Sequence, residues 1–199
     1  MLGESLFIYG SFSEGMVHFE KISKYIKEKH KAWARGSVYR LEVGFPVLLA
    51  EGSSRVEGTL VKIKETELLL SILDEFHGYS STEPAKSLYF REEITVETES
   101  SVELQPCFTY RLNPAKLPST AQLLVDGDWK TALSKNPALI DSLTDRQKCY
   151  IQKLSVSSRR DTIVYPLDVC RDLERRQLIV DKGRRFALTN LGLEVSRYL

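Results

Sequence analysis

A short apolar run that stops at a loop of glycine and serine lies near the start of the chain, and it limits the possible folds more than any other stretch. Residues 6–9, Leu-Phe-Ile-Tyr, have the composition and length of a buried strand. The loop that follows, called here the first loop (residues 10–15), is bounded by Gly10 and Gly15, which accept backbone angles that other residues avoid. Its N–H groups and the hydroxyls of Ser11 and Ser13 suit a carboxylate or carbonyl oxygen. An ordinary strand-to-helix turn is the alternative.

Composition excludes several classes of protein. The chain has 199 residues, of which 42% are hydrophobic and 28% charged, as expected for a globular protein with one main core and room for a small second domain. The net charge of +1 indicates no general affinity for nucleic acid or membranes. No apolar run is long enough to span a bilayer, and residues 1–5 do not begin a secretory signal. We therefore expect a cytoplasmic protein that does not contact membranes.

The cysteines and histidines argue against a structural metal or a disulfide framework. Cys107, Cys149 and Cys170 are scattered and odd in number, which is typical of a reducing compartment. The three histidines do not pair closely with cysteine in the sequence, so a zinc site is not expected. We expect no metal and no organic cofactor.

Charge divides the chain into two parts. Residues 1–142 carry a net charge of −4, whereas residues 143–199 carry a net charge of +5. Such asymmetry suggests two modules with different surroundings. Because Pro137 interrupts the pattern, we place the domains at residues 1–135 and 136–199.

Hydrophobic periodicity predicts an α+β first domain. Residues 55–64 alternate as a strand does, and residues 65–76 place apolar side chains at helical spacing. In chain order we predict a helix at 17–29, strands at 34–43 and 55–64, a helix at 65–76, and strands at 88–98 and 104–112. Strands with interspersed helices favour a mixed or antiparallel sheet.

Several short motifs, taken together in their order and spacing, resemble one known family. They are Tyr9-Gly10-Ser11 with Gly15, residues 56–61 (VEGTLV), residues 73–79 (LDEFHGY), residues 89–91 (YFR), residues 108–110 (FTY) and residues 127–129 (GDW). From about Leu6 to Trp129 the chain resembles the gamma-glutamylcyclotransferase-like family. The resemblance implies a small closed sheet flanked by helices, with a cavity beside the first loop. It also implies cyclisation of a gamma-glutamyl group to 5-oxoproline with release of an amine.

One position departs from the family pattern. The family's catalytic glutamate precedes the glycine of the helix-ending segment, and this chain has His77 there. That glutamate takes a proton from the substrate's α-ammonium, and histidine, with a reference pKa of about 6.5, is able to do the same. It brings no negative charge to attract the ammonium, and Glu75 and Glu83 are the candidates for that charge. The catalytic candidates are therefore His77, Glu75 and Glu83; the alternative for His77 is a helix cap.

The resemblance also implies a substrate site for a small molecule with a carboxylate and an amine. The candidate substrate-binding residues are Tyr9, Gly10, Ser11, Phe12, Ser13, Gly15 and Tyr89. For Tyr9 a position in the core, with its hydroxyl bonded to a neighbour, is the alternative.

The basic C-terminal part resembles a winged helix. Thr144 and Gln147 have the spacing of a capping box at a helix start. Residues 164–177 are predicted as a further helix, and residues 178–188, with Gly183 in the turn, as a hairpin before a last short helix. The candidates for binding nucleic acid are Arg159, Arg160, Lys182, Arg184 and Arg185. A contact with another protein, or a purely structural role, is the alternative.

Two functions are consistent with these patterns. The first is a gamma-glutamylcyclotransferase-like protein, a transferase or lyase that binds and cyclises a gamma-glutamyl or related amine-linked molecule. The second is a non-catalytic sensor of a small molecule that passes a signal to a nucleic-acid- or protein-binding winged helix. A histidine or carboxylate within reach of the first loop would favour the enzyme.

Overall fold

The computed structural model describes residues 4–157 and 166–199. The chain divides into two compact units, one of residues 1–41 and 45–135 and one of residues 42–44 and 136–199. The inclusion of residues 42–44 in the second unit is not evident from the sequence. In the described part of the chain, no helix is long and apolar enough to span a membrane.

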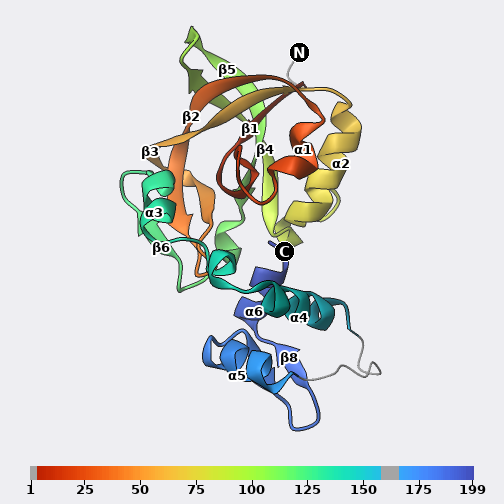
Figure 1. The fold of residues 1–199 in the computed structure, drawn as a ribbon. Helices are drawn as coiled ribbons and strands as arrows, with labels where there is room; N and C mark the ends of the chain where they lie inside the picture. Colours follow the sequence, from red (N-terminus) through yellow and green to blue (C-terminus); the bar gives the residue numbers. More distant parts are fainter. Residues whose placement is uncertain (1–3, 158–165) are drawn as a thin grey trace. The chain divides into compact units, whose positions relative to one another are not determined.

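The first unit is built on a six-stranded sheet (Figure 1). Its strands are β1 (Ser5–Ile8), β2 (Ile26–Arg40), β3 (Pro46–Ile63), β4 (Tyr89–Thr98), β5 (Ser101–Leu112) and β6 (Gln122–Leu124). Its helices are α1 (Phe19–Ser23), α2 (Thr66–His77) and α3 (Trp129–Lys135), with short 3-10 turns η2 (Gly10–Phe12), η3 (Pro84–Lys86) and η4 (Pro114–Lys116). The strand order is β3-β1-β5-β4-β2-β6, and an additional β2–β3 pairing closes the sheet. Among the described strands, β1 and β5 are the one parallel pair, so the α+β class and the closed mixed sheet are confirmed.

The helix predicted at residues 17–29 is wrong for most of its length. Only Phe19–Ser23 is helical, and β2 begins at Ile26. Residues 28–31 pair with β3 in register, for example Glu28 with Lys62 and His30 with Leu60. Pairing with a distant strand therefore overrides a weak helical pattern, as strand propensity depends strongly on the tertiary surroundings.

The two faces of β1 supply two separate apolar clusters. Phe7 packs with residues of β2, β3, β4 and β5, among them Val56 and Cys107. Leu6 and Ile8, on the other face, pack with Leu69 and Leu73 of α2 and with other buried residues. This alternation follows from the two-residue period of a strand. Since α2 covers the second face, any side chain on its inner surface is held against β1 and β5.

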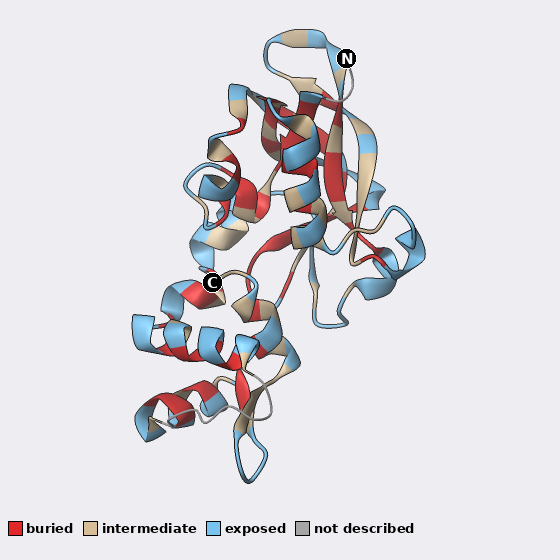
Figure 2. Ribbon diagram, turned by 90° about the vertical axis from the view of Figure 1, so that its right-hand side faces the viewer, coloured by how far each residue is buried: buried red, intermediate tan, exposed pale blue. Residues whose placement is uncertain are grey.

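The second unit is a small helical domain with a hairpin. Its elements are η5 (Leu139–Ser142), α4 (Asp145–Val156), α5 (Leu167–Arg175), β7 (Ile179–Asp181), β8 (Phe186–Leu188) and α6 (Asn190–Ser196). Thr144 and Gln147 form the expected capping box at the start of α4. The helix predicted at 164–177 is described only from Leu167, because residues 158–165 lie outside the described residues. Figure 2 shows buried residues along one side of the helices in this unit.

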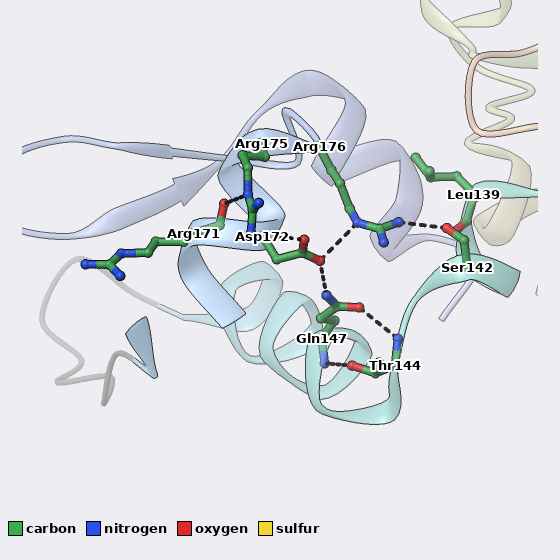
Figure 3. A network of polar contacts seen from close by, with 8 residues as sticks. All are labelled: Leu139, Ser142, Thr144, Gln147, Arg171, Asp172, Arg175 and Arg176. Carbon is green, nitrogen blue, oxygen red and sulfur yellow. Dashed lines mark hydrogen bonds and ion pairs between the residues drawn. The ribbon is translucent and has the colours of Figure 1, made fainter. Parts of the chain in front are cut away.

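The Asp172 carboxylate is the centre of a polar network in this unit (Figure 3). It accepts hydrogen bonds from the side-chain amide of Gln147 and from Nε of Arg176, the latter at 3.1 Å, and it pairs with Arg175 at 3.6 Å. Arg176 also donates to the Ser142 hydroxyl at 2.9 Å. One carboxylate thus links η5, the cap of α4 and the end of α5.

The carboxyl group of Glu194 on α6 makes the stability of the second unit depend on pH. Burial, and then the nearby Glu42 carboxylate, raise the pKa of Glu194, while Arg197 lowers it. A raised carboxyl pKa means that the folded state disfavours the charged form. The ionised carboxylate therefore lowers the free energy of unfolding above the pKa of the folded state, and this loss is absent below the ordinary pKa of about 4.3.

We therefore predict that Glu194→Gln raises the melting temperature at pH 7 and that the difference disappears as the pH falls below about 4.3. Thermal unfolding followed by circular dichroism across pH measures this. Glu174→Gln, at an exposed position of α5, is the matched control and should behave like the parent. A Glu194→Gln variant less stable than the parent at pH 7 would contradict the prediction.

Candidate functional site

The first loop folds into a tight turn that requires glycine. Gly10 and Gly15 have φ angles of +59° and +80°, in the left-handed region. A Cβ atom at Gly10 would lie 2.9 Å from Cγ of Pro46, so space and backbone angle both select glycine there. The N–H of Ser13 donates to the Gly10 carbonyl at 3.0 Å, and the Met16 N–H donates to the Ser13 carbonyl at 2.9 Å. The loop is thus shaped by its own hydrogen bonds.

Two side chains of the first loop point into the protein. Phe12 is buried, and Ser13 is buried with a hydroxyl that has no hydrogen-bond partner among the described residues. An unsatisfied buried hydroxyl costs about 1–3 kcal/mol, so such a group usually bonds a water or a ligand. Ser11 is half-buried. Ser13 is therefore the polar side chain of this loop best suited to meet a ligand.

The hydroxyl of Tyr9 is occupied by the main chain. It donates to the Tyr110 carbonyl at 3.1 Å and accepts from the Leu48 N–H at 3.0 Å. Burial raises the pKa of the Tyr9 phenol well above its ordinary value, so the group stays neutral. This geometry fits the alternative given for Tyr9, a core position with its hydroxyl bonded to neighbours, because the hydroxyl joins β1, β3 and β5. Substrate binding by Tyr9 stays a prediction.

His77 is the last residue of α2, and one nitrogen of its ring contacts a main-chain carbonyl. Its Nδ1 lies 2.8 Å from the Leu73 carbonyl oxygen. A carbonyl only accepts, so this contact places the proton of the neutral ring on Nδ1 and leaves the lone pair on Nε2. Gly78, with a φ of +58°, then ends the helix in the left-handed conformation. A capping role for Nδ1 is therefore compatible with a basic role for Nε2.

The ring of His77 lies among aromatic side chains that include one from the first loop. It stacks on Tyr110 with centroids 4.0 Å apart and an interplanar angle of 7°. Phe12 lies at 5.4 Å and Tyr89 at 5.0 Å. We call Phe12, His77, Tyr89 and Tyr110 the His77 cluster. Three of the residues predicted from the sequence, Phe12, His77 and Tyr89, are thus brought together.

A carboxylate adjoins the His77 cluster, and it belongs to Asp74. One oxygen of Asp74 accepts from the Tyr110 hydroxyl at 2.6 Å, and the other accepts from Nη1 of Arg91 at 2.7 Å. Burial, and then the hydrogen bond to Asp74, raise the pKa of Tyr110. Asp74 precedes His77 by three residues, a spacing that puts both on one helix face. That spacing is the signal in the sequence that identifies Asp74.

The two glutamates proposed from the sequence are both at exposed positions, and their catalytic role stays a prediction. Glu75 is exposed on α2, because two residues along a helix turn the side chain about 200° away from His77. Glu83 is exposed and forms an ion pair with Lys86 inside its own loop. That loop is closed by a hydrogen bond from the Ser80 N–H to the Ser87 hydroxyl at 2.9 Å. Neither glutamate contacts the His77 cluster in the part of the chain that the structure describes.

The remaining predicted residues concern the C-terminal unit. Lys182, Arg184 and Arg185 are exposed around the turn between β7 and β8. Arg159 and Arg160 lie outside the described residues. Among residues 4–157 and 166–199, no group of three or more histidine, cysteine or acidic side chains could hold a metal ion.

The closed α+β sheet, with a glycine turn after β1 and α2 packed against it, is the fold that the resemblance implies. The family model described as gamma-glutamyl cyclotransferase, AIG2-like, matches residues 6–131. This is more than half of the 199 residues, so the chain belongs to that family. No curated protein matches the chain.

Solved structures of similar fold come from several organisms. The crystal structure of an AIG2-like protein from Mus musculus has 20% identity and a TM-score of 0.46, covering 58% of this chain and 80% of that chain. YkqA from Bacillus subtilis has 19% identity and a TM-score of 0.49, covering 66% of this chain and 41% of that chain. A solution structure from Arabidopsis thaliana has 16% identity and a TM-score of 0.48, covering 82% of this chain and 93% of that chain. These values carry no argument about activity.

We predict that Tyr9→Phe destabilises the first unit by about 1–3 kcal/mol, because it leaves the Leu48 N–H without its acceptor. Urea unfolding measures the change. Tyr39→Phe, at a half-buried position of β2, is the matched control and should have the stability of the parent. Equal stability of the Tyr9→Phe variant and the parent would show that the hydrogen bonds of the Tyr9 hydroxyl contribute little to the stability of the first unit.

Proposed function

We propose that this chain binds a gamma-glutamyl compound against the first loop and cyclises it to 5-oxoproline, with His77 as the general base. The observation that carries the proposal is the position of His77 beside Phe12 of the first loop, with Nδ1 on the Leu73 carbonyl. That contact leaves Nε2 as the basic nitrogen of the neutral ring. Membership of the family supports the reaction class, and the departure from glutamate makes it a proposal.

The chemistry that the proposed reaction requires of the protein is proton transfer by a single base. Nε2 of His77 takes a proton from the substrate's α-ammonium, and the freed amine attacks the carbonyl carbon of the γ-amide. The tetrahedral adduct collapses as the bond from that carbon to the leaving nitrogen breaks. The imidazolium returns the proton to the leaving nitrogen. The attacking nitrogen also loses a second proton as it becomes the lactam nitrogen, and the released amine takes it up, so 5-oxoproline and an ammonium ion leave and the base is regenerated. General acid–base catalysis of this kind requires a group that is basic near neutral pH.

Charges around His77 support binding of an amino-acid-like group. Asp74 places a carboxylate next to Tyr110, on which His77 stacks, although Arg91 partly neutralises that charge. The family glutamate would supply a full negative charge at position 77, so this site attracts an ammonium less strongly. The buried Ser13 hydroxyl offers a donor for the substrate's carboxylate.

We predict that His77→Ala lowers 5-oxoproline release by about 10²- to 10⁴-fold, the usual contribution of a general acid or base. His77→Glu should keep or raise activity, because it restores the residue of the family pattern and adds a charge that attracts the ammonium. The assay measures 5-oxoproline released from a panel of gamma-glutamyl amino acids and amines.

Glu75→Gln is the matched control, because this exposed residue of the same helix should not affect turnover. Melting temperatures establish that each variant is folded. If neither the parent nor His77→Glu releases 5-oxoproline, the cyclotransferase proposal is wrong.

The hairpin of the C-terminal unit favours a second candidate function, a small-molecule sensor coupled to a nucleic-acid-binding winged helix. The order α4, α5, β7–β8, α6 supports a winged-helix-like fold. Arg175 and Arg176, at the end of α5, are poorly placed for phosphate because both pair with Asp172 (Figure 3). The exposed cations of the hairpin turn, Lys182, Arg184 and Arg185, are the better phosphate contacts.

We predict that duplex DNA binding, measured by gel shift, weakens steeply with salt because phosphate contacts release counterions. Combined Lys182→Ala, Arg184→Ala and Arg185→Ala should reduce the slope of log affinity against log salt by about 0.9 for each phosphate that the variant no longer neutralises. Arg175→Ala, which removes one charge from α5, serves as the control. No binding of the parent at low salt would leave a protein-contact or packing role for this unit.

A further inference from the structure

The closed sheet of the first unit is split between β2 and β4. These strands pair only through Ala32 with Thr98 and Trp33 with Glu97. Further along, residues 38–40 of β2 pair with β6 instead. Figure 1 shows β2 continuing towards β6 and away from β4. In the described part of the chain, residues 89–96 of β4 therefore have no strand partner on the β2 side.

A hollow of about 530 Å³ opens at this split. It is lined by Arg35, Glu93, Ile94, Thr95, Pro106 and Arg111. All six residues lie outside the first loop and the His77 cluster. The hollow is therefore a different place from the proposed active site, and nothing in the proposed reaction uses it.

Arg111 supplies the hollow with a guanidinium whose hydrogen bonds are incompletely used. Its side chain is only 14% exposed. Nη2 donates to the Arg35 carbonyl at 2.9 Å, and Nη1 donates to the Glu92 carboxylate at 3.3 Å. Nε is buried and has no partner among the described residues. Of the five N–H donors of the guanidinium, the Glu92 carboxylate and the Arg35 carbonyl accept two, and the buried Nε is not open to the hollow, so the remaining N–H groups of Nη1 and Nη2 are the donors left for a ligand.

Both cations of the hollow already have a carboxylate partner: Glu92 for Arg111 and Glu97 for Arg35. Arg35 donates to the Glu97 carboxylate at 2.7 Å, and Arg55 donates to the other oxygen of that carboxylate at 2.9 Å. Glu93 adds an exposed negative charge at the rim. The hollow therefore has one incompletely bonded guanidinium and acidic neighbours, a balance that suits an anion of single charge better than a phosphate.

We propose that the hollow binds a small carboxylate that also carries an amide, of about the size of an acylated amino acid. A planar guanidinium matches a carboxylate geometrically and in charge. The unpartnered edge of β4 at residues 93–95 provides main-chain groups for the amide, as sheet edges do for extended ligands. Ile94 and Pro106 provide apolar contact for the short carbon chain between the two groups. The proposal does not depend on the proposed cyclotransferase activity.

The test is a ¹H–¹⁵N NMR titration of the full chain with N-acetylglycine, which has one amide and one carboxylate. The main-chain signals of residues 93–95 and of Arg111 should shift, while those of the first loop should not. N-acetylglycinamide has the same shape without the charge, and it should bind at least about tenfold more weakly, as expected for removal of a charge-assisted hydrogen bond.

Three variants test the role of each charge. Arg111→Gln should weaken N-acetylglycine binding at least about tenfold. Glu93→Gln, at an exposed position that should not affect folding, should tighten it by about twofold to fivefold because a repelling charge is removed. Arg111→Lys keeps the charge without the planar fork, should bind more weakly than the parent, and replaces Arg111→Gln if that variant does not fold.

Specific results would overturn the proposal. Shifts confined to the first loop and the His77 cluster would assign the ligand to the proposed active site. Equal binding by N-acetylglycinamide, or unchanged binding in Glu93→Gln and the Arg111 variants, would show that Arg111 does not receive a carboxylate. Neither result would bear on 5-oxoproline release, so the two proposals fail separately.

Discussion

The two hydrogen bonds of the Tyr9 hydroxyl hold the candidate site together. By joining Tyr110 of β5 to Leu48 of β3, this group fixes the strand end from which the first loop begins. It also fixes the backbone of Tyr110, whose ring lies under His77 and whose hydroxyl meets Asp74. A buried hydroxyl with one donor and one acceptor partner is a directional link, unlike apolar packing. The geometry of the first loop and that of His77 therefore depend on one residue.

The exchange of glutamate for histidine alters the electrostatics of the site. A glutamate at position 77 would add a negative charge beside Asp74, whereas a neutral histidine leaves only the Asp74–Arg91 pair, whose charges compensate each other. Attraction of an ammonium then depends less on long-range charge and more on short contacts with aromatic faces and hydroxyls.

Ion pairing also decides which charged surfaces are available to partners. In the C-terminal unit, Asp172 pairs with Arg175 and Arg176, and Asp168 pairs with Arg146, so part of the positive charge of α4 and α5 is compensated. Lys182, Arg184 and Arg185 are exposed at the hairpin turn. At the split of the first unit, Glu97 pairs with Arg35 and Glu92 pairs with Arg111, while Nε of Arg111 and the hydroxyl of Thr98 are buried without a partner among the described residues. Net charge by itself predicts neither outcome.

The sequence alone determined the α+β class, the glycine turn and the position of His77, because these depend on local composition and on spacing along the chain. The strand at residues 26–40 was mispredicted in part, since residues 26–33 pair with residues 57–63 of β3, more than twenty residues away along the chain. Only the tertiary structure decided that the Tyr9 hydroxyl is occupied and that β2 leaves β4 for β6. Side-chain direction and strand partnership depend on which distant segments pack together, and no local pattern encodes that choice.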